Sequence, residues 1–397
     1  MAQTSAEQMR AWTGPALFSF GFRPFFLFAP IWAAVAMVLW LSALSGVITL
    51  PTRFHPVSWH AHEFLFGYLG AVLAGFLLTA VPNWTGRLPM VGWRLAALFG
   101  LWIAGRAAIL FSSGLPVFMA PTLDLAFPLM LAMLILREIV AGKNWRNLVV
   151  LALLGVFTLA NALFHIEAMT GQDAATGYGL RLGLATAVMM IAVIGGRIIP
   201  SFTRNWLAQT NRPARPTPPM QSFDKFVLVS SVIVLLLWVV LPTARSTGVL
   251  LIAAGVLHLA RQARWQAHHT AKEPLVWVLH ASYAFIPAGA LGMGTGLVLG
   301  DVSTAAAQHL WMAGAVGAMT LAVMTRATLG HTGRKLTADR ATVVIYLCLF
   351  AAVGARMLAP ALPLLSYLSG FLWLAAFGGF AAIYGPYLMS PKPHKNP

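Results

Sequence analysis

The sequence predicts an all-α protein that crosses a membrane with about twelve helices. Apolar residues make up 59% of the chain, charged residues only 9%, and the mean hydropathy is +0.78. A soluble domain carries roughly 25% charged residues, so this chain has too few to cover a water-facing surface. Apolar runs long enough to span a bilayer recur between short segments of charge, proline and glycine. We therefore expect residues 1–397 to form a single transmembrane domain.

Each apolar run defines one expected span. The spans are expected at residues 26–48, 63–81, 92–113, 117–136, 147–167, 181–199, 225–243, 247–261, 275–299, 304–325, 341–358 and 363–385. A different division of spans seven and eight near Pro242 is the alternative. The Pro-rich segment 211–222 is expected to be a cytoplasmic linker between spans six and seven.

The basic residues orient the chain. With a cytoplasmic N-terminus, all but five of the 26 lysines and arginines fall on inner segments. The five outer ones are Arg53, Arg106, Arg181, Arg245 and Arg356. By the positive-inside rule, both termini are expected in the cytoplasm. Because the net charge of +16 is spread over short loops, a nucleic-acid partner is excluded. The single cysteine, Cys348, excludes disulfides and any cysteine-only metal site.

A motif recurs along the chain and indicates three repeats of four helices. Two sets of residues follow a histidine at identical offsets: Gly67, Gly70, Thr85, Gly86 and Arg87 after His62, and Gly314, Gly317, Thr332, Gly333 and Arg334 after His309. A fainter third copy ends span six, at residues 199–203. Coincidence in a chain rich in glycine and leucine is the alternative.

Four histidines are expected at one depth near the outer surface. They are His60, His62, His165 and His309, at the outer ends of spans two, five and ten. Histidine is the commonest metal ligand, so these residues are candidate ligands. Positions i and i+2 of a helix point to different faces. His60 and His62 can therefore share one metal only where their segment is not helical. Histidines hydrogen-bonded within the bundle are the plain alternative.

A second pair of candidate ligands, His280 and His331, is expected near the inner surface. Few carboxylates lie within spans. Asp124 is expected to pair with Arg106 across a helical hairpin. Glu63, beside His62, is a candidate catalytic residue that either orients an imidazole or delivers protons. Glu167 is expected to be solvated at the outer surface.

Four arginines lie in polar turns at the expected inner edge. They are Arg87, Arg197, Arg204 and Arg334. Guanidinium groups bind carboxylates through paired hydrogen bonds, so these residues are candidates for holding the propionates of a heme. Anionic lipid headgroups are the competing ligands.

Several of these motifs resemble the NnrS family. They are residues 17–26 (LFSFGFRPFF), 59–63 (WHAHE), 81–87 (VPNWTGR), 195–205 (GGRIIPSFTRN) and 329–334 (LGHTGR). The resemblance implies a bacterial inner-membrane protein that contains heme b and copper and acts in nitric oxide metabolism or resistance. It does not say which histidines bind which metal.

The resulting hypotheses differ in what is done with nitric oxide. The first is reduction or detoxification of nitric oxide at a histidine metal site facing the periplasm. The others are non-catalytic binding or sensing of nitric oxide, heme or copper, and transport. The expected partners are nitric oxide, membrane lipids and an unidentified electron donor, and a homo-oligomer is left open.

Overall fold

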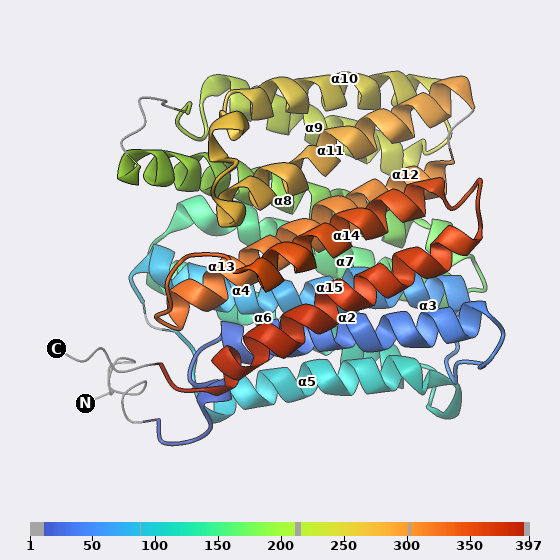
Figure 1. The fold of residues 1–397 in the computed structure, drawn as a ribbon. Helices are drawn as coiled ribbons and strands as arrows, with labels where there is room; N and C mark the ends of the chain where they lie inside the picture. The colour runs from blue at the N-terminus through green and yellow to red at the C-terminus, as the bar shows by residue number, and fades with distance from the viewer. Residues whose placement is uncertain (1–11, 88, 211–215, 301–302, 393–397) are drawn as a thin grey trace. The chain divides into compact units, whose positions relative to one another are not determined.

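The computed structural model describes residues 12–87, 89–210, 216–300 and 303–392, and these residues form helices and connecting loops without any strand. Figure 1 shows the helices in chain order. They are α2 (Phe22–Leu44), α3 (Pro56–His62), α4 (Leu69–Thr85), α5 (Trp93–Leu110), α6 (Met119–Ala141), α7 (Leu148–Met169), α8 (Tyr178–Gln209), α9 (Ser222–Val240), α10 (Arg245–Ala263), α11 (Pro274–Leu299), α12 (Thr304–His309), α13 (Met319–His331), α14 (Arg340–Leu358) and α15 (Leu364–Met389).

The expected twelve spans are confirmed. Within the described residues, 12 helical segments are long and apolar enough to cross a membrane. Helix α9 ends at Val240 and α10 begins at Arg245, so the division near Pro242 is correct. Residues 211–215 of the expected linker lie outside the described residues. Its role as a cytoplasmic linker stays a prediction.

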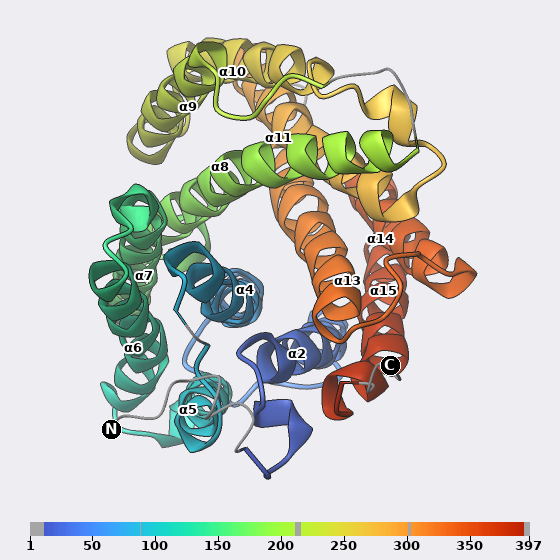
Figure 2. The same cartoon turned by 90° about the vertical axis from the view of Figure 1, so that its left-hand side faces the viewer.

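The chain forms two compact units, each with most of its contacts within itself. The first comprises residues 1–183, 327–334 and 377–397, and the second comprises residues 184–326 and 335–376. Within the first unit, α4 packs against α2 and α6, and α5 and α7 pack against α6. Figure 2 shows α4 surrounded by these helices. Arg23 on α2 donates to the backbone carbonyls of Leu388 and Ser390 and so caps the end of α15.

The second unit is built on α10, which packs against α9 and α11. Arg261 is fully buried there. Its Nε donates to Asp224 and its Nη1 to the hydroxyl of Tyr283 and the carbonyl of Ala192. A Cβ on Gly196 would collide with this guanidinium. The second glycine of the Gly195-Gly196-Arg197 motif is therefore required for packing.

Spans two, six and ten, which carry the repeated motif, are also the most enclosed. In their most apolar windows, 89%, 78% and 72% of the residues are buried, against at most 61% elsewhere. Spans two and ten each contain a π-helical segment directly after the motif histidine, at Glu63–Tyr68 and Leu310–Ala318. Gly86 and Gly333 both have positive φ angles, 66° and 77°, as glycines that end helices do. The threefold repeat itself stays a prediction.

The orientation can be tested with reporter fusions. Because basic residues favour the cytoplasmic side, fusions after Ser113 and Asp173 should report the periplasm. Fusions after Thr217 and Lys392 should report the cytoplasm. A cytoplasmic signal after Asp173 would reverse the orientation and, with it, the depth assigned to the histidines.

Candidate metal centre

The centre begins at a change of helix type in span two. Pro56 occupies the first turn of α3, where its missing N–H has no helical partner to lose. The chain then passes from α3 into the π-helical segment at Glu63 and returns to α-helix at Leu69. Single π-turns inside α-helices occur frequently at functional sites. His62 and Glu63 lie directly at this junction.

Gly67 makes room for the charged groups of the centre. A Cβ at this position would lie 2.5 Å from Nη1 of Arg106 and 2.9 Å from Oε2 of Glu63. Real Cβ atoms do not approach polar atoms so closely, so only glycine allows both groups to sit against the helix. The carbonyl of Gly67 accepts a hydrogen bond from Nε1 of Trp102 at 3.0 Å. The first motif glycine after His62 therefore has a specific structural role.

Side chains from span two, α6 and α7 converge beside this junction. Nε2 of His62 lies 3.2 Å from Oδ2 of Asp124, and Nε2 of His165 lies 3.0 Å from the same oxygen. Asn161 donates to this oxygen from Nδ2 at 2.7 Å. His62, Asp124 and His165 each offer a ligand atom, and these atoms all lie within 4.8 Å of one another. None of the four residues is more than 3% exposed.

Both ring nitrogens of His62 face oxygen atoms that accept hydrogen bonds. Nδ1 lies 2.9 Å from Oε1 of Glu63, while Nε2 faces Asp124 and lies 3.0 Å from Oδ1 of Asn161. A neutral imidazole carries only one N–H. One nitrogen would then face an acceptor with no proton between them, which is unfavourable in a buried site. A second proton on His62, a proton on one of the facing carboxyl groups, or a bound metal cation would remove this conflict.

Arg106 and Glu63 are the remaining charged groups of the cluster. Arg106 donates from Nη1 to Oε1 of Glu63 at 2.6 Å and from Nη2 to Oδ1 of Asp124. Trp32 donates to Oε2 of Glu63 at 2.8 Å. The expected pairing of Arg106 with Asp124 is confirmed, and Glu63 shares the same guanidinium. With neutral histidines the two carboxylates exceed the one guanidinium by one negative charge, which favours a bound cation.

His60 lies on a different face of α3 from His62. Its ring stacks on Trp40, with ring centroids 4.4 Å apart, and it also contacts Phe64. Because α3 is helical through both histidines, the condition for their sharing one metal is not met. His60 is absent from the cluster formed by His62, Asp124 and His165.

The remaining candidate histidines are held by protein contacts. His309 in the second unit lies 2.7 Å from the carbonyl of Ala305 through Nδ1. His280, also in the second unit, lies 2.8 Å from Oγ1 of Thr203 through Nε2. His331, in the first unit, packs against Phe20 and Phe22. The joint outer site with His309 and the inner site of His280 and His331 stay predictions.

Two of the four candidate arginines already have protein partners. Nε of Arg87 lies 2.6 Å from Oε2 of Glu138, and the guanidinium of Arg334 lies 3.7 Å from the ring centroid of Tyr387. Arg197 is half-buried and Arg204 exposed on α8. Arg87 is thus paired, whereas Nη1 of Arg334 is buried without a hydrogen-bond partner among the described residues. The propionate clamp stays a prediction.

Sequence reasoning missed two residues of the centre and part of the role of a third. Asn161 and Trp32 were not candidates, and Asp124 was expected only to neutralise Arg106. Asn161 and His165 are four residues apart on α7, a spacing that places both on one helix face. That spacing is a signal that could have identified Asn161. Trp32 offers no comparable signal.

The donor set fits a metal ion. Two imidazoles and one carboxylate are a known ligand set for iron, and imidazole also suits copper. The hydrogen bond from His62 to Glu63 matches the carboxylate–histidine contact that commonly orients metal-binding histidines. The fold and this site define a polytopic membrane protein with a buried histidine–carboxylate cluster.

Comparison with known families gives a more specific assignment. The family model described as NnrS protein matches residues 16–392. The chain therefore belongs to the NnrS family, which makes it a membrane protein related to nitric oxide. A search of curated proteins found no match.

Proposed function

We propose that this protein reduces nitric oxide at a metal ion held by His62, His165 and Asp124. The observation that most supports a bound metal ion is that both nitrogens of the buried His62 ring face acceptor oxygens. The family match supplies the link to nitric oxide. In this proposal the site faces the periplasm of a bacterial inner membrane, as the distribution of basic residues favours.

The proposed reaction converts two nitric oxide molecules, two electrons and two protons into one nitrous oxide and one water. The electrons come from an external one-electron donor. A bound iron or copper ion supplies coordination of nitric oxide and redox chemistry. Heme b and copper, which the family resemblance implies, are part of the proposal. The ligands of the heme are left open.

The residues around the ligands have separate roles in this proposal. Glu63 accepts from His62 and so fixes which nitrogen faces the metal. Asn161 holds the carboxylate of Asp124 in place. Arg106 stabilises both carboxylates as anions. Burial of the whole cluster keeps water from competing for the metal.

Purified protein tests the proposal directly. Iron, copper and heme are measured in the detergent-solubilised protein, and nitric oxide loss is followed with a reduced viologen dye as electron donor. We expect bound metal and formation of nitrous oxide. Metal binding with no nitrous oxide would favour the binding or sensing alternative, and protein without heme or metal would favour transport.

Replacing Glu63 separates its orienting role from assembly of the centre. Glu63→Gln keeps the side-chain size but weakens the hydrogen bond that orients His62. Loss of such an orienting partner typically lowers metal affinity or activity by about 10–100-fold. We expect the variant to bind metal more weakly and to consume nitric oxide more slowly. Wild-type metal affinity together with a wild-type rate would exclude both the orienting role and proton delivery by Glu63.

A further inference from the structure

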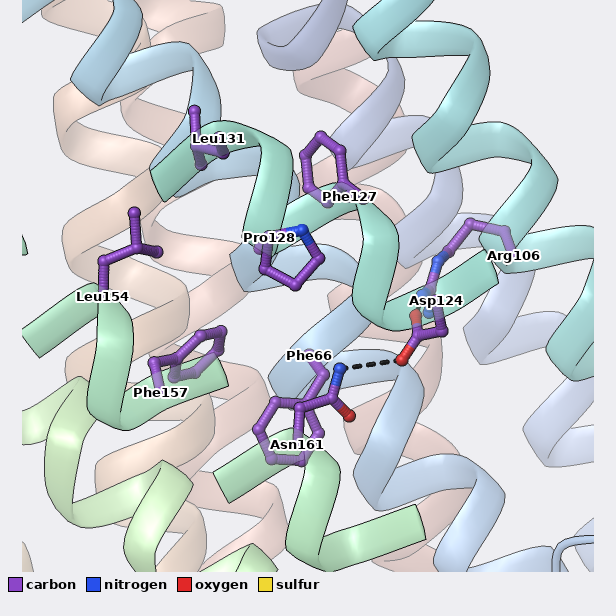
Figure 3. Close-up of a pocket in the computed structure, with 10 residues that line it drawn as sticks. Phe66, Arg106, Asp124, Phe127, Pro128, Leu131, Leu154, Phe157 and Asn161 are labelled. Atoms are coloured by element: carbon purple, nitrogen blue, oxygen red, sulfur yellow. Dashed lines mark hydrogen bonds and ion pairs between the residues drawn. The ribbon is translucent and has the colours of Figure 1, made fainter. Parts of the chain in front are cut away.

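A small cavity adjoins the metal centre on the side of α6 and α7. Helix α6 contributes Phe127, Pro128 and Leu131 to its wall, and α7 contributes Leu154 and Phe157. The cavity volume is about 10 Å³, close to the smallest that holds one water molecule. Figure 3 shows these apolar side chains around the space, with Asp124 and Asn161 together at one side.

Gly70 forms the wall on span two. Although Gly70 is buried, a Cβ added to it would find only one neighbouring atom within 4 Å, Cε1 of Phe127 at 3.9 Å. By contrast, the same addition at Gly67 meets Arg106 and Glu63. The second motif glycine after His62 therefore leaves space unfilled, whereas the first makes room for side chains.

The polar wall of the cavity offers little to a water molecule. Asn161 and Asp124 are hydrogen-bonded to each other, and both terminal nitrogens of Arg106, Nη1 and Nη2, are paired with carboxylates. Among the described residues, Nε of Arg106 is buried without a hydrogen-bond partner. A buried water typically makes two to four hydrogen bonds. A small molecule of low polarity that accepts at most one hydrogen bond fits these walls better.

We propose that this cavity is a docking site for a diatomic gas, in which nitric oxide binds next to Asp124 before it reacts. The identity of the gas as nitric oxide rests on the proposed function, but occupancy by a small apolar molecule does not. Nitric oxide is uncharged and has only two heavy atoms, so it is among the smallest ligands of low polarity. The apolar wall favours a gas that partitions into lipid. Asp124, which lines the cavity, is one of the three proposed metal ligands.

Gly70→Ala tests the cavity with little risk to folding, because the added methyl group meets no close neighbour. Gly155→Ala on α7 is the matched control, since Gly155 is exposed and a Cβ there meets nothing within 4 Å. A xenon atom is larger than this water-sized space, so ¹²⁹Xe NMR is applied to Leu154→Ala, which enlarges the space, alone and combined with Gly70→Ala or Gly155→Ala in the same detergent. We expect Leu154→Ala and its combination with Gly155→Ala to bind xenon, and the combination with Gly70→Ala to lose that binding.

Kinetics then connect the cavity to nitric oxide. One added methyl group in an apolar pocket changes discrimination by about 10–200-fold. We expect Gly70→Ala to raise the KM for nitric oxide by at least about tenfold, with metal content and melting temperature retained. The wild type should bind less xenon than Leu154→Ala, because its space is smaller.

The outcomes separate the two proposals. Failure of Leu154→Ala to bind xenon, or equal binding after Gly70→Ala and Gly155→Ala are each added to it, overturns the docking site. Xenon binding that Gly70→Ala abolishes, in a protein that consumes no nitric oxide, keeps the gas site and overturns the proposed function. An unchanged KM for nitric oxide in Gly70→Ala overturns the role of the cavity in the reaction.

Discussion

His165→Ala should insert into the membrane, lose the bound metal and lose nitric oxide consumption with it. The imidazole of His165 contacts Asp124 through Nε2 at 3.0 Å and supplies one of the three converging ligand atoms. Removing it leaves one imidazole and one carboxylate, too few protein ligands to hold a metal ion securely. Metal content is measured per purified protein, and nitric oxide loss is followed with the same external electron donor.

His60→Ala is the matched control for this experiment. His60 is two residues from His62 on α3, but its ring stacks on Trp40 instead of joining the cluster. Its removal should cost packing and leave the metal bound. Full metal in His165→Ala, or loss of metal in His60→Ala, would place the centre elsewhere. In the second case the original grouping of the outer histidines would have to be reconsidered.

The membrane fold could be predicted from the sequence because its signal is local. Each span is a continuous apolar run, and the bilayer sets its minimum length. Even the division at Pro242 was predictable, since proline does not continue a helix interior. The structure places the end of α9 at Val240 and the start of α10 at Arg245.

The centre could be predicted only in part because its residues come from separate spans. The spacing of His60 and His62 indicated that a regular helix would separate them, and α3 is helical through both residues. Which histidines bind a metal stays a prediction. Asp124 was paired correctly with Arg106. Its second carboxylate oxygen, however, faces two histidines, and nothing local in the sequence indicates that convergence.

The expectation for Glu167 was wrong for a related reason. Instead of being solvated, Glu167 is only 7% exposed and accepts from the backbone N–H groups of Tyr178 and Gly179. A carboxylate is stabilised at the start of a helix by such free N–H groups. Its partners lie at the beginning of α8, beyond an intervening loop, so a count of nearby charges does not reveal them.

Arg106→Gln should be strongly destabilised. The guanidinium of Arg106 bonds two carboxylates at once, Glu63 and Asp124, and all three residues are at most 4% exposed. Removing one member of a buried ion pair costs about 3–5 kcal/mol, because a buried charge is left without compensation. Here two carboxylates lose their common partner. We expect low yield and a lower melting temperature in detergent.

The surface pair of Arg87 and Glu138 supplies the control, because Arg87 is 40% exposed and Glu138 24% exposed. Exposed pairs contribute about 0–1 kcal/mol, so Arg87→Gln should melt close to the wild type.

Adding Asp124→Asn to Arg106→Gln removes one of the two unpaired carboxylates. The double variant should recover only part of the loss, because Glu63 remains charged beside the missing guanidinium. Equal melting temperatures for Arg106→Gln and Arg87→Gln would show that the buried charges are compensated without Arg106. Full recovery in the double variant would instead show that Arg106 acts through Asp124 alone and that its bond to Glu63 adds nothing to stability.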